Sequence, residues 1–251
     1  MFTKKIIFPG FIIIAFLISF NGFSQVQNLP KYEMGINLGG YIYQGDLTPH
    51  RFGSIETIKP GIGISGTRII SRDLSARLLF NIAKLKGDES VYKNPDYRRQ
   101  RNFAFTTPVK ELSLMLHWNI LGSNYVERRF EPYLFVGAGL SFVKVKRDFS
   151  RLNSTVFGET SEVAAGLSTD IGTAPPRTIP VFPAGAGVRY NISDRVALNA
   201  EAAYRFMHTD YLDGFSHAAN PKLTDHYSSI SIGAAYKFGK KDKYGCPRPV
   251  N

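Results

Sequence analysis

Three side chains with catalytic chemistry share one face of a predicted strand: Glu111, Ser113 and His117. A carboxylate, a hydroxyl and an imidazole are the groups of an acyl-transfer triad. Residues of a strand rise about 3.3 Å each, so Ser113 and His117 would lie roughly 13 Å apart along the strand. A nucleophile and its base must lie within hydrogen-bond distance, so a triad would need a group from a neighbouring strand. We therefore predict no catalytic residue and a non-enzymatic protein.

The remaining reactive residue types form no recognisable site. His50, His208, His217 and His226 fall in or near long loops, without the spacing of a metal centre. Cys246 is the only cysteine, which excludes a disulfide within the chain. We find no glycine-rich phosphate loop, and we predict neither a cofactor nor a metal.

The first residues have the features of a secretory signal. Lys4 and Lys5 precede an apolar run over residues 6–20, and Gly22 and Ser24 supply a small-x-small cleavage pattern. We predict removal of residues 1–24, a domain over residues 25–239 and a basic tail over 240–251. The formal net charge is +11. We predict no nucleic-acid partner, because an exported chain without a binding motif is a poor candidate for one.

Period-two alternation of apolar and polar residues dominates the rest of the chain, and it is typical of strands with two different faces. In the clearest run, Leu112, Leu114 and Leu116 lie on one face, and Glu111, Ser113 and Met115 lie on the other. The alternating runs cover about residues 32–43, 61–70, 74–83, 111–120, 130–145, 182–190, 196–206 and 229–238. The second run has the least certain register, because Arg68 falls among its apolar positions.

The lengths of the runs and of their connections indicate a membrane barrel. Strands of about 9–11 residues cross a bilayer when tilted. Short links at 71–73, 121–129 and 191–195 alternate with long ones at 44–60, 86–108, 146–179 and 209–225, as periplasmic turns alternate with extracellular loops. We predict an all-β fold: a transmembrane, eight-stranded, antiparallel up-and-down β-barrel in the outer membrane, with both mature termini in the periplasm. A soluble β-sandwich or lipocalin-like barrel would also alternate, but a second face rich in Gly, Ser, Asn and charge suits a lumen better than a dry core.

The two faces then define two sets of residues. Inside so narrow a barrel, mixed charges should pair and fill the lumen. The predicted lumen network is Glu33, Arg77, Glu111, Glu131, Arg189, Glu201, Arg205 and Lys237. Outward aromatic residues near one membrane interface should form a girdle. The predicted girdle is Tyr32, Trp118, Phe130, Tyr190, Tyr236 and Phe238.

The second long loop carries Arg98, Arg99 and Arg101. Lipopolysaccharide phosphates outside the cell are a natural counter-charge for these guanidinium groups. A solvated loop accounts for them equally well.

Several motifs resemble one known family. Residues 32–47 (YEMGINLGGYIYQGDL), the hairpin over 187–206, the segment TDYLD at 209–213 and the tail YGCP at 244–247 are similar to the DUF6089, PorG-like outer-membrane barrels of Bacteroidetes. The resemblance implies a component of the type IX secretion and gliding machinery that anchors periplasmic ring proteins. It makes the tail residues Lys240, Lys241, Lys243 and Cys246 candidates for periplasmic docking.

Three functional hypotheses follow. The first is an anchor for a secretion complex in the outer membrane. The second is a general envelope barrel that binds lipopolysaccharide or an extracellular ligand through its long loops. The third is a lumenal lipid-modifying enzyme that uses Ser113 and His117.

Overall fold

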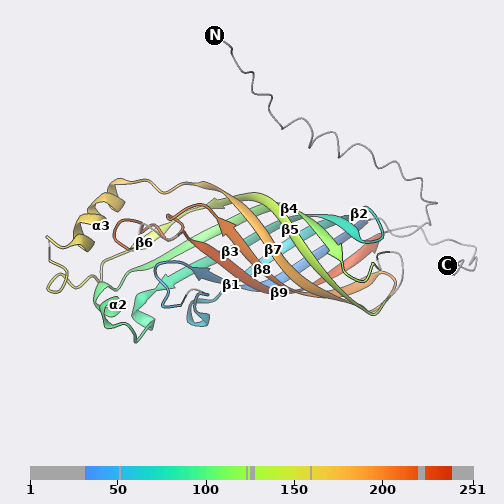
Figure 1. Cartoon of the computed structure of the whole chain (residues 1–251), viewed down its shortest axis with the longest axis horizontal. Helices are drawn as coiled ribbons and strands as arrows, with labels where there is room; N and C mark the ends of the chain where they lie inside the picture. Colours follow the sequence, from blue (N-terminus) through green and yellow to red (C-terminus); the bar gives the residue numbers. More distant parts are fainter. Residues whose placement is uncertain are drawn as a thin grey trace, which may run out of the picture.

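The computed structural model describes residues 32–50, 52–122, 124, 128–158, 160–219 and 224–238. The predicted signal segment 1–24 and the basic tail 240–251 lie outside this part of the chain. The described residues form one elongated barrel (Figure 1). Tyr32 and Phe238, the termini of the described chain, pair at one end of it, and the helical segments lie at the other end.

Eight long strands build the barrel, and each pairs antiparallel with its neighbours in sequence order. They are β1 (Tyr32–Gln44), β2 (Lys59–Ile69), β3 (Leu74–Asp88), β4 (Ala104–Asn119), β5 (Phe130–Val143), β7 (Thr178–Asn191), β8 (Val196–Met207) and β9 (His226–Phe238). The pairing of β1 with β9 closes the ring, so no strand edge is left unpaired. The predicted eight-stranded antiparallel barrel is confirmed. A short strand, β6 (Lys146–Asp148), pairs with the beginning of β4.

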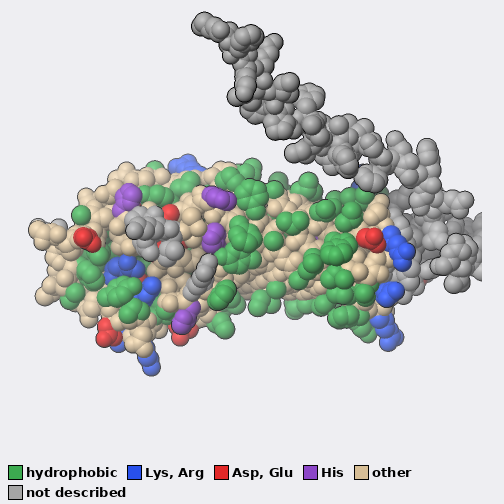
Figure 2. Space-filling model, viewed as in Figure 1, with side chains coloured by type: hydrophobic (Ala, Val, Ile, Leu, Met, Phe, Trp, Pro, Cys, Tyr) green, Lys and Arg blue, Asp and Glu red, His purple; other side chains and the backbone are tan. Residues whose placement is uncertain are grey.

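Apolar side chains of the strands point outward and polar ones point inward, which is the reverse of a soluble barrel. Leu114, Ile230 and Ile232 are more than 60% exposed, whereas Glu33, Glu111 and Arg205 are 3% exposed or less. Figure 2 shows hydrophobic side chains spread over the outer surface of the strands. An apolar exterior around a polar interior is the arrangement that hydrocarbon requires. This arrangement rules out the lipocalin-like alternative, in which the apolar face would point inward.

The β3–β4 hairpin is longer than the alternation predicted. The third run was expected to end near residue 83 and the fourth to begin at 111, but pairing continues to Asp88 and Ala104. The outward positions of this extension carry Lys84 and Lys86 instead of apolar residues. Outside the hydrocarbon layer an outward side chain need not be apolar, so the pattern stops before the strand does.

The long connections contain local structure at the end of the barrel away from the termini (Figure 1). They carry the 3₁₀ turns η1 (Ile55–Thr57) and η2 (Glu89–Val91) and the helices α2 (Asp96–Arg101) and α3 (Glu162–Gly172). The Ser161 hydroxyl caps α3 by accepting a hydrogen bond from the Ala164 amide (3.1 Å). No helix in the described part of the chain is long and apolar enough to cross a membrane.

Candidate functional site

The lumen nearest the chain termini is filled by an ion pair between β1 and β7. Both guanidinium nitrogens of Arg189 donate to the carboxylate of Glu33, at 3.0 and 2.8 Å. Beside this pair, Glu131 accepts from Asn191 (2.9 Å), and Lys237 donates to the Asn191 amide oxygen (2.9 Å). A bidentate arginine–carboxylate pair is among the strongest hydrogen-bonded contacts in proteins.

A second pair joins opposite walls of the barrel. Arg77 on β3 donates to Glu201 on β8, and the Tyr133 hydroxyl donates to the same carboxylate oxygen (2.5 Å). Arg77 and Glu201 are both buried. The three side chains come from β3, β5 and β8, so the contact braces the barrel across its width.

A third pair lies further toward the helical end. Arg205 Nε donates to Glu111 Oε2 (2.6 Å), and the Tyr227 hydroxyl donates to the same oxygen (2.7 Å). The Arg205 guanidinium lies 5.3 Å from the ring centre of Tyr41 and 5.2 Å from that of Tyr227. Ser113 donates to the other oxygen of Glu111 (3.0 Å).

The structure therefore brings together the residues of the predicted lumen network and shows which of them pair. Glu201 and Arg205 share one face of β8, yet each pairs with a residue of another strand. Between the second and third pairs, the polar interior leaves a cavity of about 10 Å³, room for roughly one water molecule.

The candidate triad does not assemble. The Ser113 hydroxyl is engaged with Glu111, whereas the His117 ring stacks on Phe135 and lies near Tyr133, with centroids 5.2 and 5.3 Å apart. The hydroxyl and the imidazole thus have different partners. Within the described ranges, no cluster of three or more His, Cys, Asp or Glu side chains could hold a metal ion.

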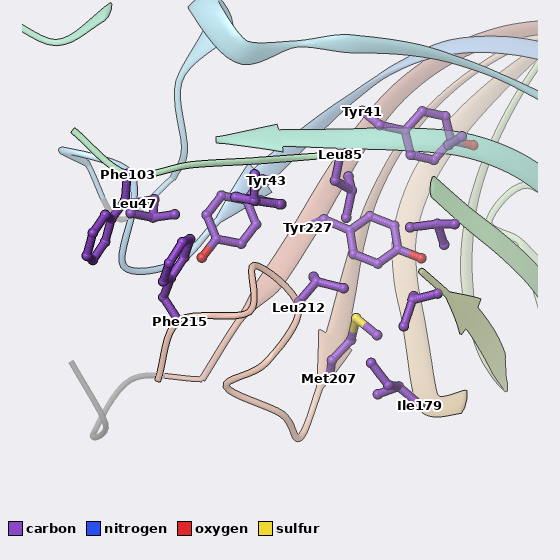
Figure 3. Packing of buried hydrophobic residues seen from close by; sticks show 14 of the residues in the cluster. Tyr41, Tyr43, Leu47, Leu85, Phe103, Ile179, Met207, Leu212, Phe215 and Tyr227 are labelled. Atoms are coloured by element: carbon purple, nitrogen blue, oxygen red, sulfur yellow. The ribbon is translucent and has the colours of Figure 1, made fainter. Parts of the chain in front are cut away.

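Above the charged lumen, the helical end of the barrel holds a hydrophobic core, which we call the cap core (Figure 3). All four long connections contribute to it: Leu47, Phe103, Leu167 and Leu212 come from successive loops. Phe103 stacks on Phe215 with ring centroids 4.5 Å apart. The cap core also includes the strand residues Tyr43, Leu85, Phe105, Val181, Met207 and Tyr227. The cap core closes the lumen at the end where the charged network stops.

A buried pair of loop carboxylates fastens the last loop to β1. The Tyr43 hydroxyl lies 2.7 Å from Asp213 Oδ2 and 2.5 Å from Asp225 Oδ1, within hydrogen-bond distance of both. Asp225 Oδ2 also accepts the Leu212 amide (2.9 Å). Burial raises the pKa of both carboxyls, and Asp225 further raises the pKa of Asp213. Sequence reasoning missed this pair, although Asp213 ends the TDYLD segment that carried part of the family resemblance.

The loop arginines predicted to contact lipopolysaccharide are only partly available. Arg98 and Arg101 are buried and donate to Glu89, Arg98 at 3.2 Å and Arg101 at 3.0 and 2.5 Å. A buried carboxylate requires such partners, so these two side chains hold α2 against η2. Of the predicted trio, Arg99 alone is exposed.

The six predicted girdle residues all point outward near the chain termini, each between 41% and 56% exposed. Tyr32 pairs with Phe238 across β1 and β9, and Phe130 pairs with Tyr190 across β5 and β7. The candidate docking residues Lys240, Lys241, Lys243 and Cys246 lie outside the described residues.

The closed ring, apolar exterior and filled interior define an outer-membrane type of β-barrel. The chain belongs to the family described as "Domain of unknown function (DUF6089)", which matches residues 9–244. No curated protein matches its sequence.

Solved structures similar to the chain include small barrels of low sequence identity. Ail of Yersinia pestis is 14% identical, with 84% of this chain and 99% of that chain covered and a TM-score of 0.45. Neisserial surface protein A is 17% identical, with 82% and 97% covered and a TM-score of 0.45. The outer-membrane enzyme PagL is 8% identical, with 82% and 99% covered and a TM-score of 0.37. Strand pairing and the outward apolar belt establish the barrel independently of these likenesses.

Proposed function

We propose that this protein is a non-enzymatic outer-membrane anchor, whose working surface is the end of the barrel that carries the short turns. The observation that supports this most is the filled lumen. Two buried ion pairs and one partly buried pair occupy the polar part, and the cap core closes the other end. An occluded lumen favours neither diffusion of solutes nor binding of a substrate inside the barrel. The outer surfaces are therefore the better candidates for an interaction site.

The short-turn end is basic on balance. Arg72, Arg128, Arg129 and Arg195 are exposed on or next to the short turns, against the exposed acids Asp73 and Asp194. Figure 2 shows Lys and Arg side chains at this end beside an acidic one. The sequence that follows adds Lys240, Lys241 and Lys243. Short turns of such barrels face the periplasm, so this surface would meet a periplasmic partner with an acidic face.

The family resemblance makes the partner more specific. We propose that the partner is a periplasmic component of a type IX secretion or gliding complex, held at the outer membrane by this barrel. The barrel itself supplies membrane retention, because its apolar belt and closed hydrogen bonding suit hydrocarbon.

Gene deletion followed by an assay of protein secretion across the outer membrane tests the proposal. We expect a secretion defect that the full chain restores. A chain truncated after Phe238, or one with Arg128→Ala and Arg129→Ala, should insert normally but no longer co-purify with periplasmic partners. Arg99→Ala, an exposed arginine at the opposite end, is the matched control. Normal secretion without the gene would refute the proposal.

A second candidate function, lipopolysaccharide binding, is supported by lysines on the outward side of β3 and β4 and next to the end of β5. Lys84, Lys110 and Lys144 are exposed at the edge of the apolar belt, and Pro108 of β4 lies between Lys84 of β3 and Lys144, the residue after β5. Lipopolysaccharide phosphates at that depth would complement these ammonium groups. Replacing the three lysines with alanine should reduce co-purifying lipopolysaccharide, whereas deletion of the tail should not. Unchanged lipopolysaccharide content would count against this function.

A further inference from the structure

A groove of about 350 Å³ lies on the outer surface of β1–β4, toward the chain termini. Its surface is almost entirely apolar apart from one basic side chain. The outward residues that line it are Tyr32, Met34, Gly66, Arg68, Ala76, Leu78 and Leu114.

Strand register explains why the surface is hollow there. Met34, Gly66, Leu78 and Leu114 lie side by side across the four strands. Gly66 has no side chain, and a Cβ placed on it would meet no atom within 4 Å. Ala76 is the other small residue. It pairs with Arg68, and this pair lies one outward position nearer the chain termini than the pair of Gly66 and Leu78. Two small residues therefore form a floor between larger apolar walls.

Arg68 stands at the end of the groove that faces the membrane interface. It is exposed, it lies opposite the girdle residue Tyr32, and it interrupts an otherwise apolar outward pattern. Among the described side chains, no carboxylate forms an ion pair with it. An arginine at the edge of hydrocarbon is stabilised when its aliphatic stem lies on apolar surface and its guanidinium reaches an anion at head-group depth.

We infer that this groove binds one phospholipid of the periplasmic leaflet, with an acyl chain over Gly66 and Ala76 and the phosphate on Arg68. Guanidinium and phosphate match in charge and geometry, and Gly66 precedes Arg68 by one outward step of about 7 Å along the strand. A partner helix, about 10–12 Å across, is too wide for a channel floored by two residues. The inference rests on the proposed orientation, which puts this end of the barrel in the periplasmic leaflet.

Native mass spectrometry of the full mature chain, purified in detergent and titrated with phosphatidylglycerol, tests the inference. We expect one lipid to be retained at low lipid concentration. Arg68→Gln should weaken retention about fivefold, as expected for loss of one basic group at a membrane surface, about 1 kcal/mol. Gly66→Leu fills the groove and should weaken retention at least as much.

Matched controls separate this site from the general lipid-facing surface. Ala202→Leu adds three carbons, against four for Gly66→Leu, at an outward position of β8 on the far side of the barrel, and Arg129→Gln removes a charge from the same rim. Both should retain lipid like the parent chain. Heat-modifiable gel mobility shows that each variant is folded, and Gly66→Ala serves if Gly66→Leu fails to fold.

Equal retention by Gly66→Leu and Ala202→Leu would overturn the site. Gly66-dependent retention of lipopolysaccharide in place of phospholipid would also overturn it, because lipopolysaccharide belongs to the other leaflet. The titration uses purified protein, so its result is independent of the secretion assay. A barrel that binds this lipid but is dispensable for secretion would refute the anchor function alone.

Discussion

Removal of the Glu111 carboxylate tests whether the ion pairs hold the barrel together. Glu111 is 1% exposed and accepts hydrogen bonds from Arg205, Tyr227 and Ser113. Glu111→Ala would leave the Arg205 charge buried without its partner. Breaking one side of a buried pair costs about 3–5 kcal/mol, because the remaining charge cannot recover its hydration. Both side chains are almost fully buried, so solvent screening does not reduce this figure.

The single tryptophan provides the assay. Trp118 lies on the outward face at the girdle and is 49% exposed to the surroundings of the barrel. Its fluorescence should report urea-induced unfolding in lipid vesicles, and gel mobility before and after heating should report the folded fraction. Glu56→Ala, which removes an exposed carboxylate, is the control and should change the free energy of unfolding by less than about 0.5 kcal/mol.

A double variant separates the effect of leaving one charge unpaired from the effect of removing both charges. Glu111→Leu combined with Arg205→Met replaces both charges with apolar side chains of similar size. It should recover much of the stability lost in either single variant, because no charge is left buried alone. If Glu111→Ala and Arg205→Met each unfold at the same urea concentration as the parent, the charge network does not stabilise the barrel and our reasoning fails.

Three further predictions concern the cap and its loops. Burial raises the pKa of Asp213 and Asp225, so the folded cap keeps a proton that the unfolded chain loses above about pH 4. The cap should therefore resist proteolysis better at pH 5 than at pH 8.5, and Asp213→Asn should weaken this dependence; equal protection at both pH values would contradict it. Glu89→Gln should speed cleavage of the second long loop without altering barrel gel mobility, because two buried arginines lose their counter-charge; an unchanged cleavage rate would show that the pairs do not fix the loop. Gly214→Ala should cost about 1–3 kcal/mol in thermal or urea unfolding, since Gly214 has φ +87° and a Cβ would meet the Arg147 side chain at 2.6 Å; Gly158→Ala, where a Cβ meets nothing within 4 Å, is the control, and equal stability of the two variants would argue against strain.

The strands were predictable because two different media contact their two faces. Along β4, Leu112, Leu114 and Leu116 point outward while Glu111 and Ser113 point into the lumen, so apolar and polar residues alternate, with Met115 as the inward exception. The same cause limits the prediction. Beyond the hydrocarbon layer the alternation has no reason to continue, and the ends of β3 and β4 were missed.

The members of the lumen network were predictable, but their pairing was not. Parity along a strand shows which face a side chain occupies. It does not show how far a side chain reaches across the barrel or at what height it meets another strand. Arg77 and Glu201 are 124 positions apart and meet only because the ring closes. Glu201 and Arg205 lie on the same face of β8, yet their partners are on other strands, which the sequence pattern cannot show.

The cap core left almost no periodic signal in the sequence. Leu47 and Phe215, for example, are single apolar residues between polar or glycine neighbours in the loops. Each gains its significance from residues in other loops, which a local pattern cannot reveal. A pairing signal did exist for the arginine segment, because Glu89 lies in the same loop and could have been recognised as an internal partner for Arg98 and Arg101.

The composition of the cap core dictates the order in which the molecule can be completed. In the proposed orientation, all four long hairpin tips are delivered through the bilayer from the periplasm before they can meet outside. Leu212 and Phe215 belong to the last tip, so the cap core stays incomplete until that tip has been translocated. In this orientation the strands form in the membrane first, and the cap core is completed last, on the outer side of the membrane.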